Sequence, residues 1–271
     1  MAYGLLNGKR GIISGALDEN SIAWKVALKA KEEGATFTLT NAPIAMRMGA
    51  IKELAEHCNA EIIPADATSI EDLTALFTQS TDVLGGKVDF VLHSIGMSPN
   101  IRKGKAYTDL NYEWYKQSID ISALSFHKMM QTAYKLDAIN EWGSIVALTY
   151  MAAQRTFPFY GDMADAKAVL ESIARSFGYQ YGKYRNVRVN TISQSPTPTK
   201  AGGGIGGFDK FFDFADKTAP LGNATAAQCA DYVVTLFSDL TRMVTMQNLF
   251  HDGGFSMTGI SEEVMALINK D

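Results

Sequence analysis

The fold of this chain is decided first by the stretch IISGALDENSIA, residues 12–23. An apolar run ends at Gly15, a polar loop follows, and the pattern predicts that a helix begins near Ser21. Glycine permits close approach of the backbone, and the Ser21 hydroxyl and the first N–H groups of a helix can face a phosphate. The second and third glycines of the usual dinucleotide fingerprint are missing, so the segment alone fits an ordinary strand–turn–helix unit equally well.

Strand and helix patterns alternate outward from this stretch along almost the whole chain. Apolar runs predict strands at Arg10–Ser14, Thr36–Thr40, Glu61–Pro64, Val88–His93, Ser144–Tyr150, Val187–Ile192 and Gln247–Phe250. Helical spacing and capping residues predict helices over Ser21–Glu33, Ser69–Leu84, Leu110–Ala138, Tyr160–Tyr181 and Phe208–Lys217. This alternation predicts an α/β fold with a single Rossmann-type, doubly wound parallel sheet of about seven strands and helices on both faces. No linker interrupts it, so we expect one dinucleotide-binding catalytic domain over residues 1–271.

Composition excludes several classes of protein. The 271 residues are 46% hydrophobic and 20% charged, which rules out disorder as the main state. The formal net charge is −4 and there is no basic tract, so no nucleic-acid partner is expected. Two cysteines without a CxxC pair and four scattered histidines predict no metal site. No apolar run approaches the roughly 18 residues of a membrane span, and no signal-peptide pattern opens the chain, so we expect no membrane association and a cytoplasmic location.

A glycine-rich patch occupies residues 201–207. Its glycines Gly202, Gly204 and Gly207 match the G-x-G-x-x-G spacing of dinucleotide binders, but that motif must lie between a first strand and its helix. Here it follows the sixth predicted strand. We interpret it as part of a mobile substrate-binding loop, near residues 196–218, that covers the active site.

The most informative residues are Tyr150, Tyr160 and Lys167. The pattern places Tyr150 at a strand end and both Tyr160 and Lys167 on the following helix, where seven residues at about 100° each return to nearly the same face. Ligands of α/β proteins bind at the carboxyl ends of the strands, so an ammonium there could hold ribose hydroxyls while a phenol handles a proton. Spacing alone leaves open that these are an interfacial tyrosine and a solvated lysine.

The end of the second strand bears on the choice of cofactor. Dinucleotide folds often place an acidic residue there for the ribose hydroxyls, or a basic one for a 2′-phosphate. The stretch 40–43 offers neither, and Arg47 lies a few residues further on. The sequence therefore favours NADH over NADPH.

Taken together, these motifs resemble those of the bacterial NADH-dependent enoyl-[acyl-carrier-protein] reductases of type II fatty-acid synthesis, divergent members of the short-chain dehydrogenase/reductase superfamily. The resemblance rests on Tyr-x6-Lys followed by Ala, a second Tyr ten residues earlier, the turn from Gly15 to Ser21-Ile22-Ala23, and the stretch HSIG at residues 93–96. It covers essentially the whole chain. Ordinary short-chain dehydrogenases instead use Tyr-x3-Lys with a Ser seventeen residues before the Lys; here Met163 and Tyr150 occupy those two places.

This resemblance implies an enzyme that reduces the trans-2 double bond of enoyl-[acyl-carrier-protein] thioesters with NADH, the last step of the elongation cycle. It implies that Tyr160 bonds the thioester carbonyl, that Lys167 holds the nicotinamide ribose, and that Tyr150 is a second catalytic tyrosine. The residues it assigns to NADH/NAD+ are Gly15, Ser21, Ile22, Asp66, Ala67, Ile95, Lys167, Thr197, Pro198, Thr199, Lys200 and Ala201. Ser98 falls where the family contacts substrate, and no metal is implied.

The resemblance also implies partners. These are acyl carrier protein carrying the enoyl chain, a homotetrameric assembly, and inhibitors of the triclosan kind. The chain departs from the family at Gln194-Ser195, at Pro198 and at Ala42. We interpret His93 as a packed or backbone-bonded histidine rather than as a general base. Aromatic residues that could line the cleft are Tyr150, Phe157, Phe159, Tyr160 and Phe208.

Two rival functions remain at this point. A short-chain dehydrogenase acting on a ketone or alcohol would need the Ser and the Tyr-x3-Lys motif, which the chain lacks. A regulator that binds NAD(H) without chemistry would have no use for Tyr150, Tyr160 and Lys167 in register.

Overall fold

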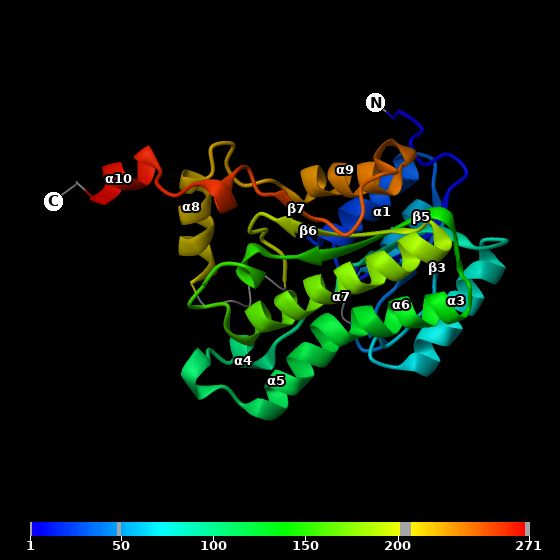
Figure 1. Ribbon diagram of the computed structural model, residues 1–271, viewed down its shortest axis with the longest axis horizontal. Coiled ribbons are helices and arrows are strands. Elements are labelled where there is room, and N and C mark those ends of the chain that lie inside the picture. Colours follow the sequence, from blue (N-terminus) through cyan, green and yellow to red (C-terminus); the bar gives the residue numbers. More distant parts are fainter. Residues whose placement is uncertain (1, 48–49, 201–206, 269–271) are drawn as a thin grey trace.

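The fold is built on one sheet of seven strands, all paired in parallel (Figure 1). It is seen in a computed structural model that describes residues 2–47, 50–200 and 207–268. The strands are β1 Arg10–Ser14, β2 Thr36–Thr40, β3 Glu61–Ile62, β4 Val88–His93, β5 Ile139–Thr149, β6 Arg188–Gln194 and β7 Asn248–His251. Their order across the sheet is β3-β2-β1-β4-β5-β6-β7. This is the Rossmann-type order extended by a seventh strand, so the predicted fold class is confirmed.

Helices cover both faces of the sheet. They are α1 Ile22–Glu32, α2 Ile51–Cys58, α3 Ile70–Val83, α4 Pro99–Arg102, α5 Tyr112–Ile119, α6 Ser125–Lys135, α7 Gly161–Arg185, α8 Phe208–Thr218, α9 Ala226–Phe237 and α10 Glu262–Ile268. Apolar residues of α1, α2 and α9 pack on one face, and those of α3, α6 and α7 pack on the other. No helix within the described residues is both long and apolar enough to cross a membrane.

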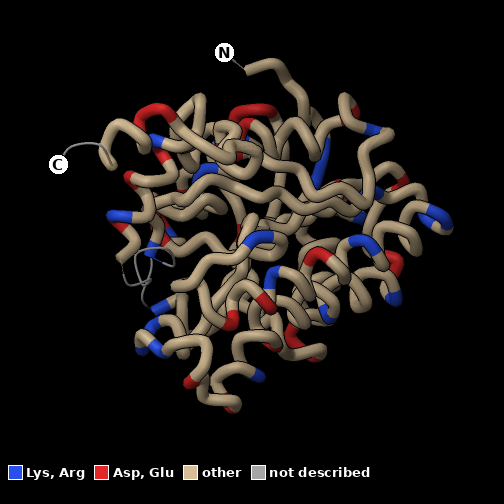
Figure 2. Tube along the Cα trace, turned by 60° about the vertical axis from the view of Figure 1, so that its left-hand side comes forward, with Lys and Arg blue, Asp and Glu red and all other residues tan. Residues whose placement is uncertain are grey.

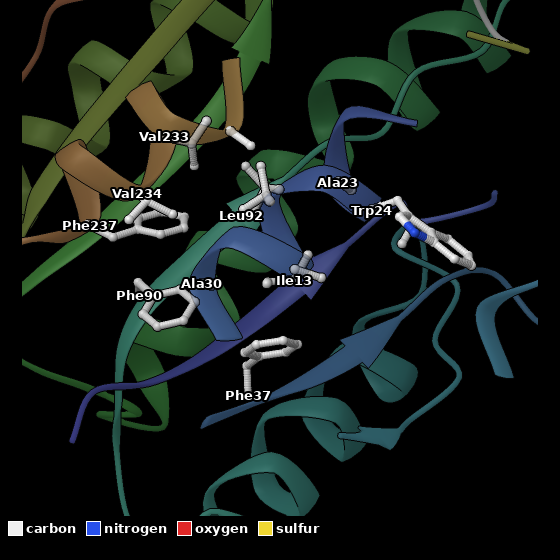
Figure 3. Close-up of a cluster of buried hydrophobic side chains, with 14 of the residues drawn as sticks. Ile13, Ala23, Trp24, Ala30, Phe37, Phe90, Leu92, Val233, Val234 and Phe237 are labelled. Atoms are coloured by element: carbon white, nitrogen blue, oxygen red, sulfur yellow. The ribbon is translucent and has the colours of Figure 1, made fainter. Parts of the chain in front are cut away.

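The core beneath α1 and α9 shows how the central strands are covered (Figure 3). The rings of Phe90 on β4 and Phe237 on α9 stack with their centroids 4.5 Å apart. Gly11 makes room for this pair, because a Cβ there would lie 2.1 Å from the Phe90 ring. The sequences of the central strands are therefore continuous runs of apolar residues, as expected for parallel strands buried on both faces.

Several boundaries differ from the sequence prediction. The helix predicted over residues 110–138 starts at α5 and ends at α6, with a π-helical segment, Asp120–Leu124, between them. Helix α7 begins at Gly161, so Tyr160 is its N-cap residue and not part of the helix. Strand β5 starts earlier and ends at Thr149, before Tyr150, while β3 has only two residues. The sequence pattern did not predict the π-helical segment, because the extra residue in a π turn changes the backbone hydrogen bonds while apolar side chains continue along the same side of the helix.

The loops after the strands gather at one end of the molecule, where α4 and α8 also lie (Figure 1). Figure 2 turns this end forward and shows basic and acidic residues interspersed along the trace. A third apolar cluster sits here and joins the end of β5 to α8: Tyr150, Met151, Ala152, Ala215, Ala219 and Phe255. The site predicted from sequence lies at this end.

Candidate active site

The chain turns sharply at Gly15, directly after β1. Strand β1 lies between β2 and β4, so the direction of chain progression across the sheet reverses beside it. Gly15 has φ +92°, and a Cβ there would lie 2.0 Å from the carbonyl oxygen of Ser94. Only glycine fits, because any side chain would collide with the loop after β4. The turn thus brings the ends of β1 and β4 into contact, as a dinucleotide site at this point requires.

The turn continues to Ser21, which caps α1. Its hydroxyl donates to the carbonyl oxygen of Asp18 at 2.7 Å and accepts from the Leu17 amide at 3.3 Å. The hydroxyl therefore closes the turn, and the first N–H groups of α1, beginning at Ile22, have no partner within the helix. Across the turn, Lys200 Nζ lies 3.0 Å from Asp18 Oδ2. This ion pair joins the loop after β6 to the predicted phosphate site.

The remaining predicted cofactor residues lie at the same edge of the sheet. Asp66 is exposed and Ala67 is buried in the loop after β3, and Ile95 is half-buried after β4. Thr197 donates to the Ser195 carbonyl oxygen at 2.9 Å, and Pro198 and Thr199 follow it. Ala201 and most of the glycine patch lie outside the described residues, so the predicted mobile loop is described only at its two ends, residues 196–200 and 207–218.

The two tyrosines predicted to be catalytic lie against each other. Tyr150 follows β5, Tyr160 precedes α7, and their ring centroids are 5.0 Å apart at 50°. The Tyr150 hydroxyl is buried and has no hydrogen-bond partner among the described residues. Burial raises the pKa of both phenols above the usual range, and at Tyr150 the neighbouring Tyr160 adds to the effect. Both groups are therefore neutral hydrogen-bond donors at physiological pH.

Lys167 is the seventh residue of α7, and it is buried. Its Nζ donates to the Leu148 carbonyl oxygen at 2.8 Å, and only 7% of the residue is exposed. Burial lowers its pKa to about 8, against the opposing effect of Glu171 one turn further along the helix. A Cβ on Gly96 would lie 3.7 Å from this amine. The structure therefore brings Lys167 to the loop after β4 and excludes a solvated surface lysine.

The aromatic lining differs in part from the prediction. Tyr150, Phe157 and Tyr160 do come together, with the Phe157 ring 5.4 Å from that of Tyr150. Phe159 instead points outward and is 77% exposed, and Phe208 packs against Phe212 on its own helix. Their places are taken by Phe211 of α8 and by Phe255, both of which contact Phe157. The sequence did not indicate these two residues, because Phe211 in the first half of α8 and Phe255 near the carboxyl end are distant along the chain from Phe157 and meet it only in the fold.

Ser98 lies beside the site, but its hydroxyl is already used. It caps α4 by accepting from the Ile101 amide at 3.1 Å, and it donates to Asp162 Oδ1 at 2.6 Å. Asp162 was not singled out from sequence, because an acidic residue in the first turn of a helix is ordinary capping chemistry. Its complete burial is visible only in the folded chain.

His93 is a packed histidine, as the sequence suggested, although its partner is a side chain rather than the backbone. Its Nε2 lies 2.8 Å from Ser125 Oγ, and that hydroxyl donates to the Ile121 carbonyl oxygen. Burial, with the nearby Lys167, lowers the His93 pKa to about 3. It therefore stays neutral and serves in packing. Within the described residues, no three His, Cys, Asp or Glu side chains are grouped so as to hold a metal ion.

The parallel sheet has this order, Tyr150 directly follows β5, and the buried Lys167 lies in the first two turns of α7. Together these features define an oxidoreductase of the short-chain dehydrogenase/reductase class. Comparison with known proteins narrows the class. The model of the family described as "Enoyl-(Acyl carrier protein) reductase" matches residues 15–256. The chain belongs to this family.

Individual relatives agree over nearly the full chain. The solved "FabI-NADH complex from Alistipes finegoldii" is 62% identical, covers 97% of this chain and 93% of its own, and superposes with a TM-score of 0.96. Enoyl-[acyl-carrier-protein] reductase [NADH] 1 of Rhizobium meliloti is 34% identical over 96% of this chain and 94% of its own length. The FabI of Rickettsia bellii is 36% identical over 97% and 100%.

Proposed function

We propose that this chain reduces the trans-2 double bond of enoyl-[acyl-carrier-protein] thioesters with NADH, the last reduction of the fatty-acid elongation cycle. One observation carries the proposal: two neutral phenols, Tyr150 and Tyr160, lie against each other just beyond β5, and the buried amine of Lys167 bonds the carbonyl oxygen of Leu148 near the end of the same strand. Relatives that share the chain's whole length are named as NADH-dependent enoyl-[acyl-carrier-protein] reductases, which supports the choice of reaction.

The described residues fit the cofactor. Gly15 leaves no room for a side chain where the turn meets the loop after β4, so backbone can approach a pyrophosphate closely. Tyr150 has a buried hydroxyl in need of a partner, and Lys167 has a donor aimed at the same end of the sheet. The residues that would hold NADH are Gly15, Ser21, Ile22, Asp66, Ala67, Ile95, Lys167, Thr197, Pro198, Thr199 and Lys200, with Ala201 beyond the described part of the chain.

In the proposed reaction, bound NADH supplies a hydride for the β-carbon of the substrate. Tyr160 donates a hydrogen bond to the thioester oxygen, where negative charge develops as the hydride arrives. A proton from solvent or a relay then reaches the α-carbon and completes the reduction. A donor that strengthens only as charge appears lowers the barrier without tightening substrate binding. The raised pKa of Tyr160 keeps its proton in place for this role.

Lys167 acts on the cofactor side of the site. Its amine is anchored by the Leu148 carbonyl oxygen and keeps two further N–H bonds for ribose hydroxyls. With a pKa of about 8, it is largely charged at neutral pH.

The proposal extends to partners and location. The acyl chain would enter beside Ser98, which contributes its backbone because its hydroxyl is occupied. We propose a homotetramer, since large apolar side chains lie exposed near the carboxyl end, including Met257, Ile260 and Ile268. The proposal also includes a cytoplasmic location, binding of triclosan-like inhibitors and a mobile substrate-binding loop, of which the structure describes residues 196–200 and 207–218. If the loop closes over the site, NAD+ with triclosan should protect it from protease, and equal cleavage with and without ligands would count against it.

The reaction is tested by mixing the purified protein with NADH and crotonyl thioester and following the reduced-nicotinamide absorbance. We expect the absorbance to fall, and to fall more slowly with Tyr160→Phe. A β-ketoacyl thioester is the matched control. If NADH is oxidised in the presence of the β-ketoacyl thioester but not of the enoyl thioester, the protein is a ketone reductase. Binding of NADH without turnover on either substrate would identify a dinucleotide-binding regulator.

A further inference from the structure

Asp162 is a fully buried carboxylate in the first turn of α7, two residues after Tyr160. Its Oδ1 accepts from the Ser98 hydroxyl at 2.6 Å. Its Oδ2 accepts from the Asn100 side-chain amide at 2.9 Å and lies 2.8 Å from Ser118 Oγ. None of the ion pairs formed by the described residues includes it.

Such burial needs a compensating arrangement. A carboxylate removed from water loses its hydration, and without a cation that loss is offset only by hydrogen bonds and dipoles. Here three side-chain donors and the N-terminus of α7 supply them. Helix capping by itself requires neither burial nor three donors from other elements. The arrangement therefore serves to join those elements to α7.

All three donors belong to one segment, residues 98–118, which contains α4 and all but the last residue of α5 and lies beside α7 (Figure 1). Ser98 is the N-cap of α4. The Asn100 side chain also bonds the backbone of Asn111 in both directions, at 3.1 Å and 2.9 Å. Ser118 lies in α5, where its hydroxyl is also 2.8 Å from the Trp114 carbonyl oxygen. Asp162 thus holds both ends and the middle of this segment at a single point.

The same point is close to the reacting groups. Immediately before Ser98, the Met97 amide donates to Ser122 Oγ at 3.0 Å in the π-helical segment. Ser122 Oγ in turn lies 3.5 Å from Met163 Sδ on α7. The loop that carries Ile95 and Gly96 past Lys167 is therefore held at its far end by Ser122 and Asp162 together. Displacing Asp162 would change the distance between Tyr160 and this loop.

We propose that Asp162 is a positioning residue that fixes the substrate side of the site, residues 98–118, in register with Tyr160. The inference rests on the function proposed above. Its effect is on the thioester: the acyl carbonyl is held within reach of Tyr160 only while the segment is tied to α7. The cofactor side is held separately, by the turn at Gly15 and by the bond from Lys167 to Leu148, so NADH affinity does not depend on it.

The test compares two buried carboxylates. Asp162→Asn keeps the shape but replaces one acceptor oxygen by a donor that faces the Asn100 and Ser118 donors. Glu33→Gln is the matched control, because Glu33 is also unexposed but lies just after the end of α1 and accepts from the Tyr3 and Leu5 amides of the amino-terminal arm. Both variants should lower the unfolding temperature. At a temperature where both are folded, only Asp162→Asn should reduce kcat/KM for the enoyl thioester, by about 10- to 100-fold, as misplacement on the ångström scale does.

Two further measurements make the result decisive. The Kd for NADH, from nicotinamide fluorescence, should be unchanged in Asp162→Asn, and amide hydrogen exchange should accelerate over residues 98–118. If Asp162→Asn does not fold, Ser118→Ala removes one donor while keeping the charge, and it should show the same changes at smaller size. Wild-type kcat/KM in the folded variant, or an equal loss in Glu33→Gln, would overturn the proposal. If the wild-type protein reduces no enoyl thioester, the proposed function is wrong. Unchanged amide hydrogen exchange over residues 98–118 in Asp162→Asn would instead contradict the positioning role of Asp162 alone.

Discussion

The rings of Tyr150 and Tyr160 lie 5.0 Å apart at an angle of 50°, although one residue follows β5 and the other precedes α7. Both phenols have raised pKa values, yet only the Tyr150 hydroxyl is buried without a partner among the described residues. The two phenols also differ in exposure, since Tyr150 is buried and Tyr160 is half-buried. Substitution can separate their roles.

Tyr160→Phe should reduce kcat by about ten- to a thousand-fold, the range expected for one lost donor to a developing oxyanion. The NADH Kd should hardly change, because the hydroxyl acts on the thioester. Steady-state kinetics with an acyl-carrier-protein substrate and fluorescence titration with NADH measure the two effects. Tyr150→Phe should cause a smaller loss that varies with the substrate. Full activity in Tyr160→Phe together with inactive Tyr150→Phe would reverse the two assignments.

Tyr150→Phe should also leave the free protein as stable as the wild type or more so. A buried hydroxyl without a partner costs about 1–3 kcal/mol, and the substitution removes it without leaving a cavity. Tyr181→Phe is the control, because the Tyr181 hydroxyl donates to the Met130 carbonyl oxygen at 2.9 Å and its removal should lower the free energy of unfolding by about 1 kcal/mol. Urea denaturation without cofactor compares them. Equal destabilisation by both substitutions would contradict the prediction.

Lys167→Ala should weaken NADH binding at least tenfold as well as slow turnover, since a charged donor is lost from the cofactor side. The lowered pKa of about 8 adds a pH signature. The amine is charged below that value, so wild-type NADH affinity should fall as pH rises through about 8, and this dependence should disappear in Lys167→Ala. Lys116→Ala, a change at an exposed lysine of α5, is the control. A variant with normal NADH affinity would refute the ribose contact.

NADH should give a higher kcat/KM than NADPH. The residues after β2, Asn41 and Ala42, carry no charge, and the Asn41 amide donates to the Ala16 carbonyl oxygen at 3.0 Å. A 2′-phosphate placed there would find no cation to replace its hydration. Arg47 lies exposed in the 3₁₀ turn Ala45–Arg47. If NADPH is preferred tenfold, Arg47→Ala should abolish that preference and the proposed NADH selectivity is wrong.

Acid should release the amino-terminal arm through Glu33. Burial alone would raise the pKa of this carboxyl, but the ion pair with Lys29 and the amides of Leu5 and Tyr3 lower it to about 2 from 4.5. A lowered pKa stabilises the fold fully above 4.5, and that contribution is lost as pH falls from 4.5 towards 2. Because the partner Lys29 is partly exposed, screening by solvent leaves a contribution of about 1–2 kcal/mol. Glu33→Gln should therefore show a shallower fall in stability over this pH range, and identical slopes would contradict the assignment.

Most of the architecture could be predicted from the sequence, because parallel strands that are buried on both faces consist of short runs of apolar residues. The bounds of β1, β2 and β4 agree residue for residue with the prediction. The prediction was wrong where hydrogen bonding rather than side-chain pattern decides the outcome. The π segment between α5 and α6 keeps its apolar face, and the start of α7 depends on the turn made at Gly161, with φ +45°.

The sequence by itself determined the parallel sheet and several of its helices, among them α1, α3 and most of α7, since local pattern records these features directly. It singled out Tyr150, Tyr160 and Lys167 through their spacing together with the family resemblance. Only the tertiary structure decided how they meet. The burial of Lys167 that lowers its pKa, the contacts of Phe211 and Phe255 with Phe157, and the three donors on Asp162 all join segments that are distant along the chain. Desolvation and hydrogen bonding depend on which side chains pack around a group and exclude water from it. That packing joins different helices and strands, so a local sequence pattern does not record it.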